Sequence, residues 1–267
     1  MQLDAYQVVL LGCGQMGSAL ISGAVASGRV VPTKLTCVDV VPERADTLAE
    51  SLGAWSLSEL PDPQRGPRLV VVAVKPQDVE GVLTSYELGP QDVVVSVAAG
   101  VSMAKLEAWS GQADVVRAMP NTPSLVGKGV TGVYSRMNCP AALALFESVG
   151  MVVPLAKESL FDALTGVSGS GPAYVFLILE ALADGGVKMG LDRDTARRIA
   201  AATVEGAAAL AGASELHTAE LKDRVASPGG TTIAALAHLE DKQVRAAMIG
   251  AVEVAARRSA EMSEKLS

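Results

Sequence analysis

Short apolar runs alternate with helical patterns through the first 155 residues of the chain. Seven runs are rich in β-branched residues and end at turn residues, so each predicts a β-strand. They lie at residues 8–11, 35–40, 69–74, 93–97, 115–118, 130–134 and 151–155. Several are apolar throughout, as expected of strands covered on both faces. Repeated strand–helix units predict a mainly parallel, doubly wound sheet with right-handed crossovers.

The segments between these strands carry helix signals. Pro42 is placed to begin one helix, and Gly53 follows its apolar stripe at a position suited to a helix C-terminus. Ser102 is placed to cap a second helix, and Pro140 to begin a third. These signals support the alternation of strands and helices.

The pattern changes to helix throughout after residue 159. Breaks are predicted at residues 168–172, at 185–192, near 212 and at 227–230. Residues 199–211 are Ala-rich and apolar on most faces, so this helix has to be covered. We expect the helical half to bury surface against a second subunit, and a compact monomeric bundle is the alternative. The change of pattern divides the chain into domains at residues 1–157 and 158–267.

Composition narrows the range of partners. The chain of 267 residues is 49% hydrophobic and only 3% aromatic, and its net charge is −7. This charge argues against nucleic acid or an anionic membrane as partner. Cys13, Cys37 and Cys139 are isolated in the sequence and form no metal-ligand pair, so no metal site is predicted.

The sequence shows neither the pattern of a signal peptide nor a run long enough to span a membrane. The N-terminus lacks a basic stretch followed by an apolar one, and the apolar run 175–183 is interrupted by Glu180. It is much shorter than the ~20 residues that span a bilayer. We therefore expect a soluble protein in a reducing cytoplasm.

A Gly-rich turn follows the first predicted strand and precedes a helix. In such a turn Gly12 would make the sharp bend, Gly14 would let a pyrophosphate approach the backbone, and Gly17 would let helix and strand pack closely. The helix N-terminus would add free N–H groups for the phosphates. The cofactor-binding residues predicted here are Gly12, Cys13, Gly14, Gln15, Met16 and Gly17. The context predicts a nicotinamide dinucleotide site in a Rossmann-type domain.

Asp39 follows the second predicted strand, about 20 residues beyond the last glycine, where a carboxylate holds the adenosine ribose. A carboxylate there repels a 2′-phosphate, which favours NADH as the cofactor. Arg44 begins the next helix and offers a partner for the 2′-phosphate of NADPH, or is simply a solvated helix residue. NADH is the slightly favoured interpretation.

Loops after three further strands are expected to complete this site, since ligands lie outside the carboxyl ends of strands in open α/β sheets. Lys75 is the only cation among these loops and is placed near the pyrophosphate, although a surface role at a helix start is equally open. The additional cofactor-binding residues predicted are Ala73, Val74, Lys75, Pro76, Ala98, Ala99 and Asn121.

A second candidate site lies in the helical half. The segment from Ser227 runs through Pro-Gly-Gly into Thr231 and Thr232, immediately before a predicted helix. Small residues and hydroxyls at a helix start suit a small carboxylate and a hydrogen bond to a reacting group. An ordinary helix cap is the alternative, but a cap needs only one such residue. We assign Val225, Ser227, Gly230, Thr231 and Thr232 to substrate binding.

These motifs together closely resemble those of Δ1-pyrroline-5-carboxylate reductases, which catalyse the last step of proline biosynthesis. The resemblance covers essentially the whole chain. It is carried by residues 12–17, 73–77, 119–123, 166–174, 183–190 and, most specifically, 222–232. Arg224 is a departure, because relatives often carry Asn or Gln there.

The resemblance implies hydride transfer from NAD(P)H to the C=N bond of pyrroline-5-carboxylate, giving L-proline. It implies that the hydroxyl of Thr232, the one catalytic residue assigned, lies beside the ring nitrogen, and that Ser227, Gly230 and Thr231 hold the carboxylate. It also implies an intertwined homodimer, with five dimers in a decamer. The C-terminal half would then be an all-helical dimerisation domain.

The sequence disfavours two rival functions. A β-hydroxyacid dehydrogenase requires a lysine shortly after a Gly-rich segment, but the first lysine after residues 168–171 is Lys188. A non-catalytic NAD(P) sensor is disfavoured by the complete segment 227–232. His217 and His238 stand outside any motif, which suits an imine better than a carbonyl, since an imine arrives partly protonated.

Overall fold

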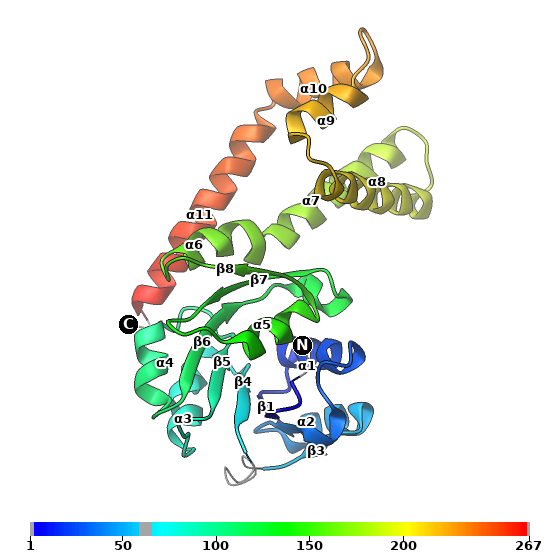
Figure 1. Cartoon of the computed structure of the whole chain (residues 1–267). Coiled ribbons are helices and arrows are strands. Elements are labelled where there is room, and N and C mark those ends of the chain that lie inside the picture. The colour runs from blue at the N-terminus through cyan, green and yellow to red at the C-terminus, as the bar shows by residue number, and fades with distance from the viewer. Residues whose placement is uncertain (1–2, 59–65, 266–267) are drawn as a thin grey trace. The chain divides into compact units, whose positions relative to one another are not determined.

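The computed structural model describes residues 3–58 and 66–265, and it contains one eight-stranded sheet (Figure 1). The strand order is β3-β2-β1-β4-β5-β6-β7-β8. All neighbouring strands are parallel except β6 and β7. The strands are β1 Gln7–Leu11, β2 Leu35–Val38, β3 Trp55–Ser56, β4 Arg68–Val72, β5 Val93–Ser96, β6 Asp114–Met119, β7 Gly129–Tyr134 and β8 Gly150–Pro154. The seven predicted strands and the doubly wound fold are confirmed, and β3 is an addition.

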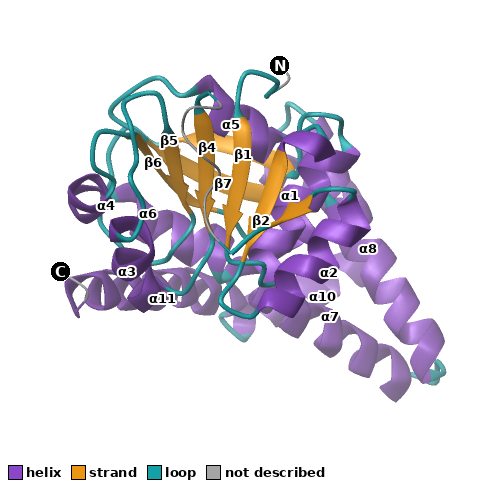
Figure 2. Ribbon diagram, turned by 90° about the horizontal axis from the view of Figure 1, so that it is seen from below, coloured by secondary structure: helices purple, strands orange, loops and turns teal. Residues whose placement is uncertain are grey.

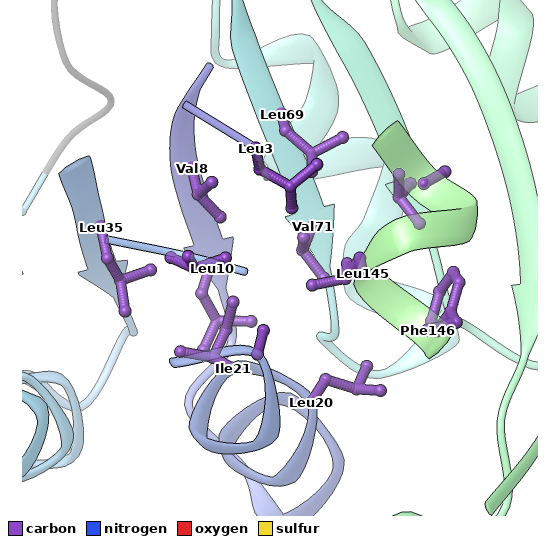
Figure 3. Packing of buried hydrophobic residues seen from close by; sticks show 14 of the residues in the cluster. Leu3, Val8, Leu10, Leu20, Ile21, Leu35, Leu69, Val71, Leu145 and Phe146 are labelled. Carbon is purple, nitrogen blue, oxygen red and sulfur yellow. The ribbon is translucent and has the colours of Figure 1, made fainter. Parts of the chain in front are cut away.

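Helices cover both faces of the sheet (Figure 2). Alternate strand residues point to opposite sides, so Leu10 joins one buried cluster and Val9 the other. In the first cluster Leu145 packs with Leu10 and Val71 (Figure 3). The helices of the first cluster are α1 Gln15–Ala26, α2 Pro42–Leu52 and α5 Pro140–Glu147; those of the second are α3 Val79–Thr84 and α4 Met103–Trp109.

The predicted helix ends are confirmed by their geometry. Pro42 and Pro140 occupy the first turns of α2 and α5. Gly53 ends α2 with φ +69°, a conformation that L side chains rarely adopt. The hydroxyl of Ser102 accepts a hydrogen bond from the Lys105 N–H (3.4 Å) at the start of α4.

The rest of the described chain is helical. Helix α6 (Leu160–Leu164) continues through a π-helical turn (Thr165–Gly169) into α7 (Gly171–Lys188). The remaining helices are α8 Arg193–Ala213, α9 Thr218–Val225, α10 Thr231–Asp241 and α11 Val244–Lys265. The predicted break at Gly185 and Gly186 falls inside α7. A Cβ on Gly186 would lie 3.3 Å from the Ala196 Cβ, so this glycine serves the close packing of α7 on α8.

Contacts divide the chain into two units, Met1–Gly169 with Ala255–Ser267 and Ser170–Val254. The second unit exposes large apolar side chains on α7, notably Phe176 (64%) and Leu177 (67%). The helical run Leu160–Lys188 is long and apolar enough to cross a membrane, judged by length and composition alone. The sequence had indicated a shorter apolar run. An exposed apolar surface of this kind is typical of a surface that binds a partner.

Candidate active site

The Gly-rich turn lies at the point where the order of the sheet reverses, because β1 is flanked by β2 and β4. Gly12 has φ +98°, and a Cβ there would lie 2.8 Å from the Ala73 carbonyl. A Cβ on Gly17 would lie 2.2 Å from the Gly12 oxygen, so α1 packs on this turn without room for a side chain. Gly14 has open space, and α1 begins there with no side-chain cap. The turn therefore presents bare backbone N–H groups, which fits a pyrophosphate.

Asp39 fastens this turn to the end of β2. Its Oδ2 accepts the Cys13 N–H (2.7 Å), and its Oδ1 accepts the Val41 N–H (2.9 Å) at the start of α2. Each carboxylate oxygen can accept a further bond, so both can still face a ribose. The sequence indicated a carboxylate at this place but not its bonds to the backbone.

A cleft of about 870 Å³ opens beside the turn. Its lining includes six residues that the sequence assigned to the cofactor: Gly12, Gly14, Asp39, Ala73, Val74 and Lys75. It also includes Arg44, Val40 and Tyr86, which the assignment left out. Within residues 3–58 and 66–265, Arg44 makes no ion pair, so its charge is available to an anion in the cleft.

The other predicted cofactor residues lie outside this lining. Cys13 and Gln15 line a smaller groove along α1, of about 640 Å³. Met16 and Gly17 lie on the side of α1 that packs against the sheet, and Pro76 begins a 3₁₀ turn. Ala98 is buried and Ala99 is exposed. Asn121 is buried, and its side-chain amide is hydrogen-bonded to backbone groups. For the buried residues among these, direct contact with a ligand would need a change of structure.

The thiol of Cys13 lies under the Gly-rich turn, 3.7 Å from the Val38 oxygen. Hydrogen bonding with Cys37, burial and the charge of Asp39 raise the pKa of Cys13 well above its ordinary value. Cys13 is therefore held as a neutral thiol and packs as a small apolar residue.

The predicted substrate segment forms a turn and a helix start in the second unit. The Gly230 N–H donates to the Ser227 oxygen (3.0 Å), and Gly229 between them has φ +69°. With Pro228 ahead of Gly229, this is the pattern of a type II turn. Helix α10 begins at Thr231, and its first turn carries no acidic residue.

The same segment has little room for larger residues. A Cβ on Gly230 would lie 2.3 Å from the Ser227 Oγ. Thr232 is half-buried, whereas Val225 is exposed. This places bare N–H groups and two threonine hydroxyls at one helix N-terminus, which suits a small carboxylate. At the opposite end of α9, His217 caps the helix through Nδ1, which accepts the Ala219 N–H (3.1 Å).

Family models match both parts of the chain. Residues 158–262 match a model described as pyrroline-5-carboxylate reductase dimerisation. Residues 7–100 match one described as NADP oxidoreductase, coenzyme F420-dependent. The first match includes the apolar helix α7 and assigns this part of the chain to a dimerisation domain.

Relatives and solved structures match over nearly the full length. Pyrroline-5-carboxylate reductases of Pisum sativum and Pseudomonas aeruginosa are 40% and 39% identical, each alignment covering 97% of this chain and 97% of the relative. The structure of a pyrroline-5-carboxylate reductase from Coxiella burnetii matches with a TM-score of 0.87 and 32% identity, covering 97% and 98% of the two chains. That from Plasmodium falciparum with NADP bound matches with a TM-score of 0.80 and 31% identity, at the same coverage.

These matches confirm the resemblance inferred from the motifs, the Rossmann-type fold and the helical dimerisation domain. The identities exceed 30% over almost the whole of each chain. The chain belongs to the pyrroline-5-carboxylate reductase family, NAD(P)-dependent oxidoreductases of the final step of proline biosynthesis.

Proposed function

We propose that this chain reduces 1-pyrroline-5-carboxylate to L-proline with the two clusters described above as cofactor and substrate sites. The observation that carries the proposal is the bare helix start at Gly230–Thr232, together with the Gly-rich turn at Gly12–Gly17. NAD(P)H, when bound, supplies a hydride. Residues 1–157 hold the cofactor, and residues 158–267 hold the substrate and form the dimer.

The cofactor lies across the carboxyl ends of the central strands. Its adenosine occupies the cleft beside Asp39 and Arg44, and its pyrophosphate rests on the Gly12–Gly17 turn, with Lys75 as the nearby cation. The nicotinamide extends toward the loops after β5 and β6, where Ala98 and Ala99 lie.

NADH is the better donor, and NADPH is also accepted. The Asp39 carboxylate bonds ribose hydroxyls and repels a 2′-phosphate, which supports NADH. Arg44 in the cleft lining offers that phosphate a charged partner, which supports use of NADPH. The Plasmodium falciparum relative with NADP bound agrees with this second use.

The substrate carboxylate binds at the start of α10. Ser227 and Thr231 donate to its oxygens. Gly230, whose N–H already donates to the Ser227 oxygen, leaves the helix start open to the carboxylate, and Val225 borders the site. The Thr232 hydroxyl hydrogen-bonds the ring nitrogen and orients the C=N carbon toward the hydride. Since an imine is basic enough to arrive protonated, positioning of the ring supplies most of the required effect.

The assembly is a homodimer, repeated five times in a decamer. Exposed apolar side chains on α7 and α8, such as Phe176 and Ile199, support burial against a partner. Three free cysteines support residence in a reducing cytoplasm. Sedimentation of the purified protein measures the assembly, and a monomeric species at micromolar concentration contradicts it.

The variant Thr232→Ala tests the substrate site. If Thr232 orients an iminium, kcat falls toward the low end of the ~10²–10⁴-fold range of general acid–base effects, with an unchanged pH profile. A larger loss with a shifted pH profile assigns Thr232 as a proton donor. Thr218→Ala, at the first position of α9, is the matched control and retains activity. Full activity of Thr232→Ala excludes Thr232 from the reaction.

A further inference from the structure

Asn121 holds together two segments that are far apart in the sequence. It follows β6 and is only 7% exposed. The oxygen and the nitrogen of its side-chain amide each form a hydrogen bond with a backbone group. Its Oδ1 accepts the Val130 N–H (2.8 Å) near the start of β7, and its Nδ2 donates to the Ser168 oxygen (3.0 Å). The sequence predicts direct cofactor contact for Asn121, whereas in the structure its amide bonds two backbone groups.

The segment that Asn121 holds is the π-helical turn Thr165–Gly169. A π-turn interrupts the regular helix ladder and occurs frequently at functional sites. This one rests on the sheet, because a Cβ on Gly169 would lie 3.5 Å from the Met119 Cε at the end of β6. The Ser168 Oγ is buried and has no hydrogen-bond partner among the described residues. Such a turn needs outside support, and the Asn121 amide supplies it.

Asn121 lies at the edge of the sheet where the cofactor is expected to bind. Strands β1, β4, β5 and β6 are parallel, so their carboxyl ends share one edge with the Gly-rich turn. The half of such an edge beyond β4 receives the reactive nucleoside of a dinucleotide. Asn121 comes two residues after the end of β6, at this edge.

We propose that Asn121 is a positioning residue for hydride transfer. It fixes the Ser168 backbone, and hence the turn Thr165–Gly169, beside the carboxyl ends of β6 and β5, where the reactive ring of the cofactor is bound. It acts through this turn and does not contact the cofactor. The proposal rests on the proposed function, since it concerns the geometry of the same reaction.

Loss of the amide therefore slows chemistry without weakening cofactor binding. In Asn121→Ala the Val130 N–H and the Ser168 carbonyl both lose their partner. A misplacement of ~1 Å costs up to about 10²-fold in rate, so we expect the hydride-transfer step to slow by about 10–100-fold. The dissociation constant of the reduced cofactor is expected to stay within about twofold.

Two further variants separate this role from a general loss of stability. Asn121→Asp keeps an acceptor for the Val130 N–H and replaces the donor that faces the Ser168 carbonyl with an oxygen, so it disturbs the turn selectively. Ser135→Ala removes another clamp between the same strands, because the Ser135 Oγ donates to the Val115 oxygen (2.8 Å) at the opposite end of β6. It is the matched control.

The experiment combines single-turnover hydride transfer with titration of NADH fluorescence and thermal unfolding of each purified variant. Slow transfer in both Asn121 variants, with unchanged cofactor affinity and a near-normal Ser135→Ala, supports the proposal. A cofactor affinity at least about tenfold weaker with normal transfer at saturation makes Asn121 a direct contact and overturns it. Equal slowing in Ser135→Ala, or normal transfer in Asn121→Asp, also overturns it. Failure of the unmodified protein to reduce the imine would instead refute the proposed function.

Discussion

The ion pair between Arg68 and Asp92 is almost completely buried, and removing one of its charges is expected to destabilise the sheet strongly. The two side chains are 2% and 4% exposed. The Arg68 Nε and Nη2 donate to the two Asp92 carboxylate oxygens at 3.0 and 2.6 Å. The backbone N–H groups of Arg68 and Gly89 donate to the same oxygens at 3.0 and 2.8 Å. The carboxylate thus accepts four bonds in an environment closed to water.

The variant Asp92→Asn keeps the size of the side chain but removes the negative charge that pairs with Arg68 in this buried place. Breaking a buried pair in this way costs about 3–5 kcal/mol. At about 2–4 °C per kcal/mol for a domain of this size, the apparent Tm falls by about 6–20 °C. Glu147→Gln is the control, because its partner Arg29 forms a surface pair at 3.1 Å worth at most about 1 kcal/mol.

The pair also predicts a pH dependence. Burial alone would raise the pKa of Asp92, but the bonds from Arg68 and Gly89 outweigh it and lower the pKa below the ordinary value. The resulting stability is present above the ordinary Asp pKa of about 3.9 and is lost as the pH falls through the lowered pKa. The stability of the unmodified protein therefore falls in this acidic range, and Asp92→Asn lacks that component.

Thermal unfolding, followed at one protein concentration and several pH values, measures both effects. The pair lies at the amino ends of β4 and β5, opposite the cleft, so the KM for NADH should not change below the melting temperature. A loss of stability no larger than that of Glu147→Gln would refute the reasoning. So would an acid dependence that survives in Asp92→Asn unchanged.

Three further substitutions have distinct expected outcomes. Arg44→Ala should raise the KM for NADPH by about 10–100-fold, the worth of a charged hydrogen bond, and leave that for NADH unchanged; equal effects in steady-state kinetics would contradict this role. Gly17→Ala should lower the free energy of unfolding by about 1–3 kcal/mol and weaken NADH binding in a fluorescence titration, because the new Cβ meets the Gly12 oxygen. Wild-type affinity would show that α1 shifts freely. Gln243→Gly should stabilise the protein by about 1 kcal/mol in thermal unfolding, since Gln243 has φ +56°; a lower Tm would contradict this.

Local signals in the sequence were sufficient for most of the sheet. Apolar β-branched runs predicted seven strands within a few residues, and Gly53 and Ser102 marked helix ends correctly. Strand β3 has only two residues, Trp55 and Ser56, which is too short for any periodic pattern. The π-turn escaped prediction because it lies against Met119 of β6, a contact that the local sequence does not reveal.

The sequence predicted the types of residue in the candidate site better than the contacts that these residues make. The spacing of Gly12, Gly14 and Gly17 indicated the turn, and its geometry follows from their lack of side chains. The bond of Asp39 to the Cys13 N–H and that of Asn121 to the Ser168 oxygen could not be foreseen, because these partners lie 26 and 47 residues away. A side chain of the right chemistry at the right edge can serve the ligand or the loop that holds it, and only the folded chain distinguishes the two.

The most direct test of the central claim follows one hydride into the product. The purified protein is mixed with 1-pyrroline-5-carboxylate and NADH that carries two deuterium atoms at C4, one on each face, and the product is examined by mass spectrometry and NMR. The account predicts L-proline with one deuterium on the ring carbon beside nitrogen and away from the carboxylate, formed with an equal amount of NAD⁺. Absence of proline with both NADH and NADPH, or proline without that label, would contradict it.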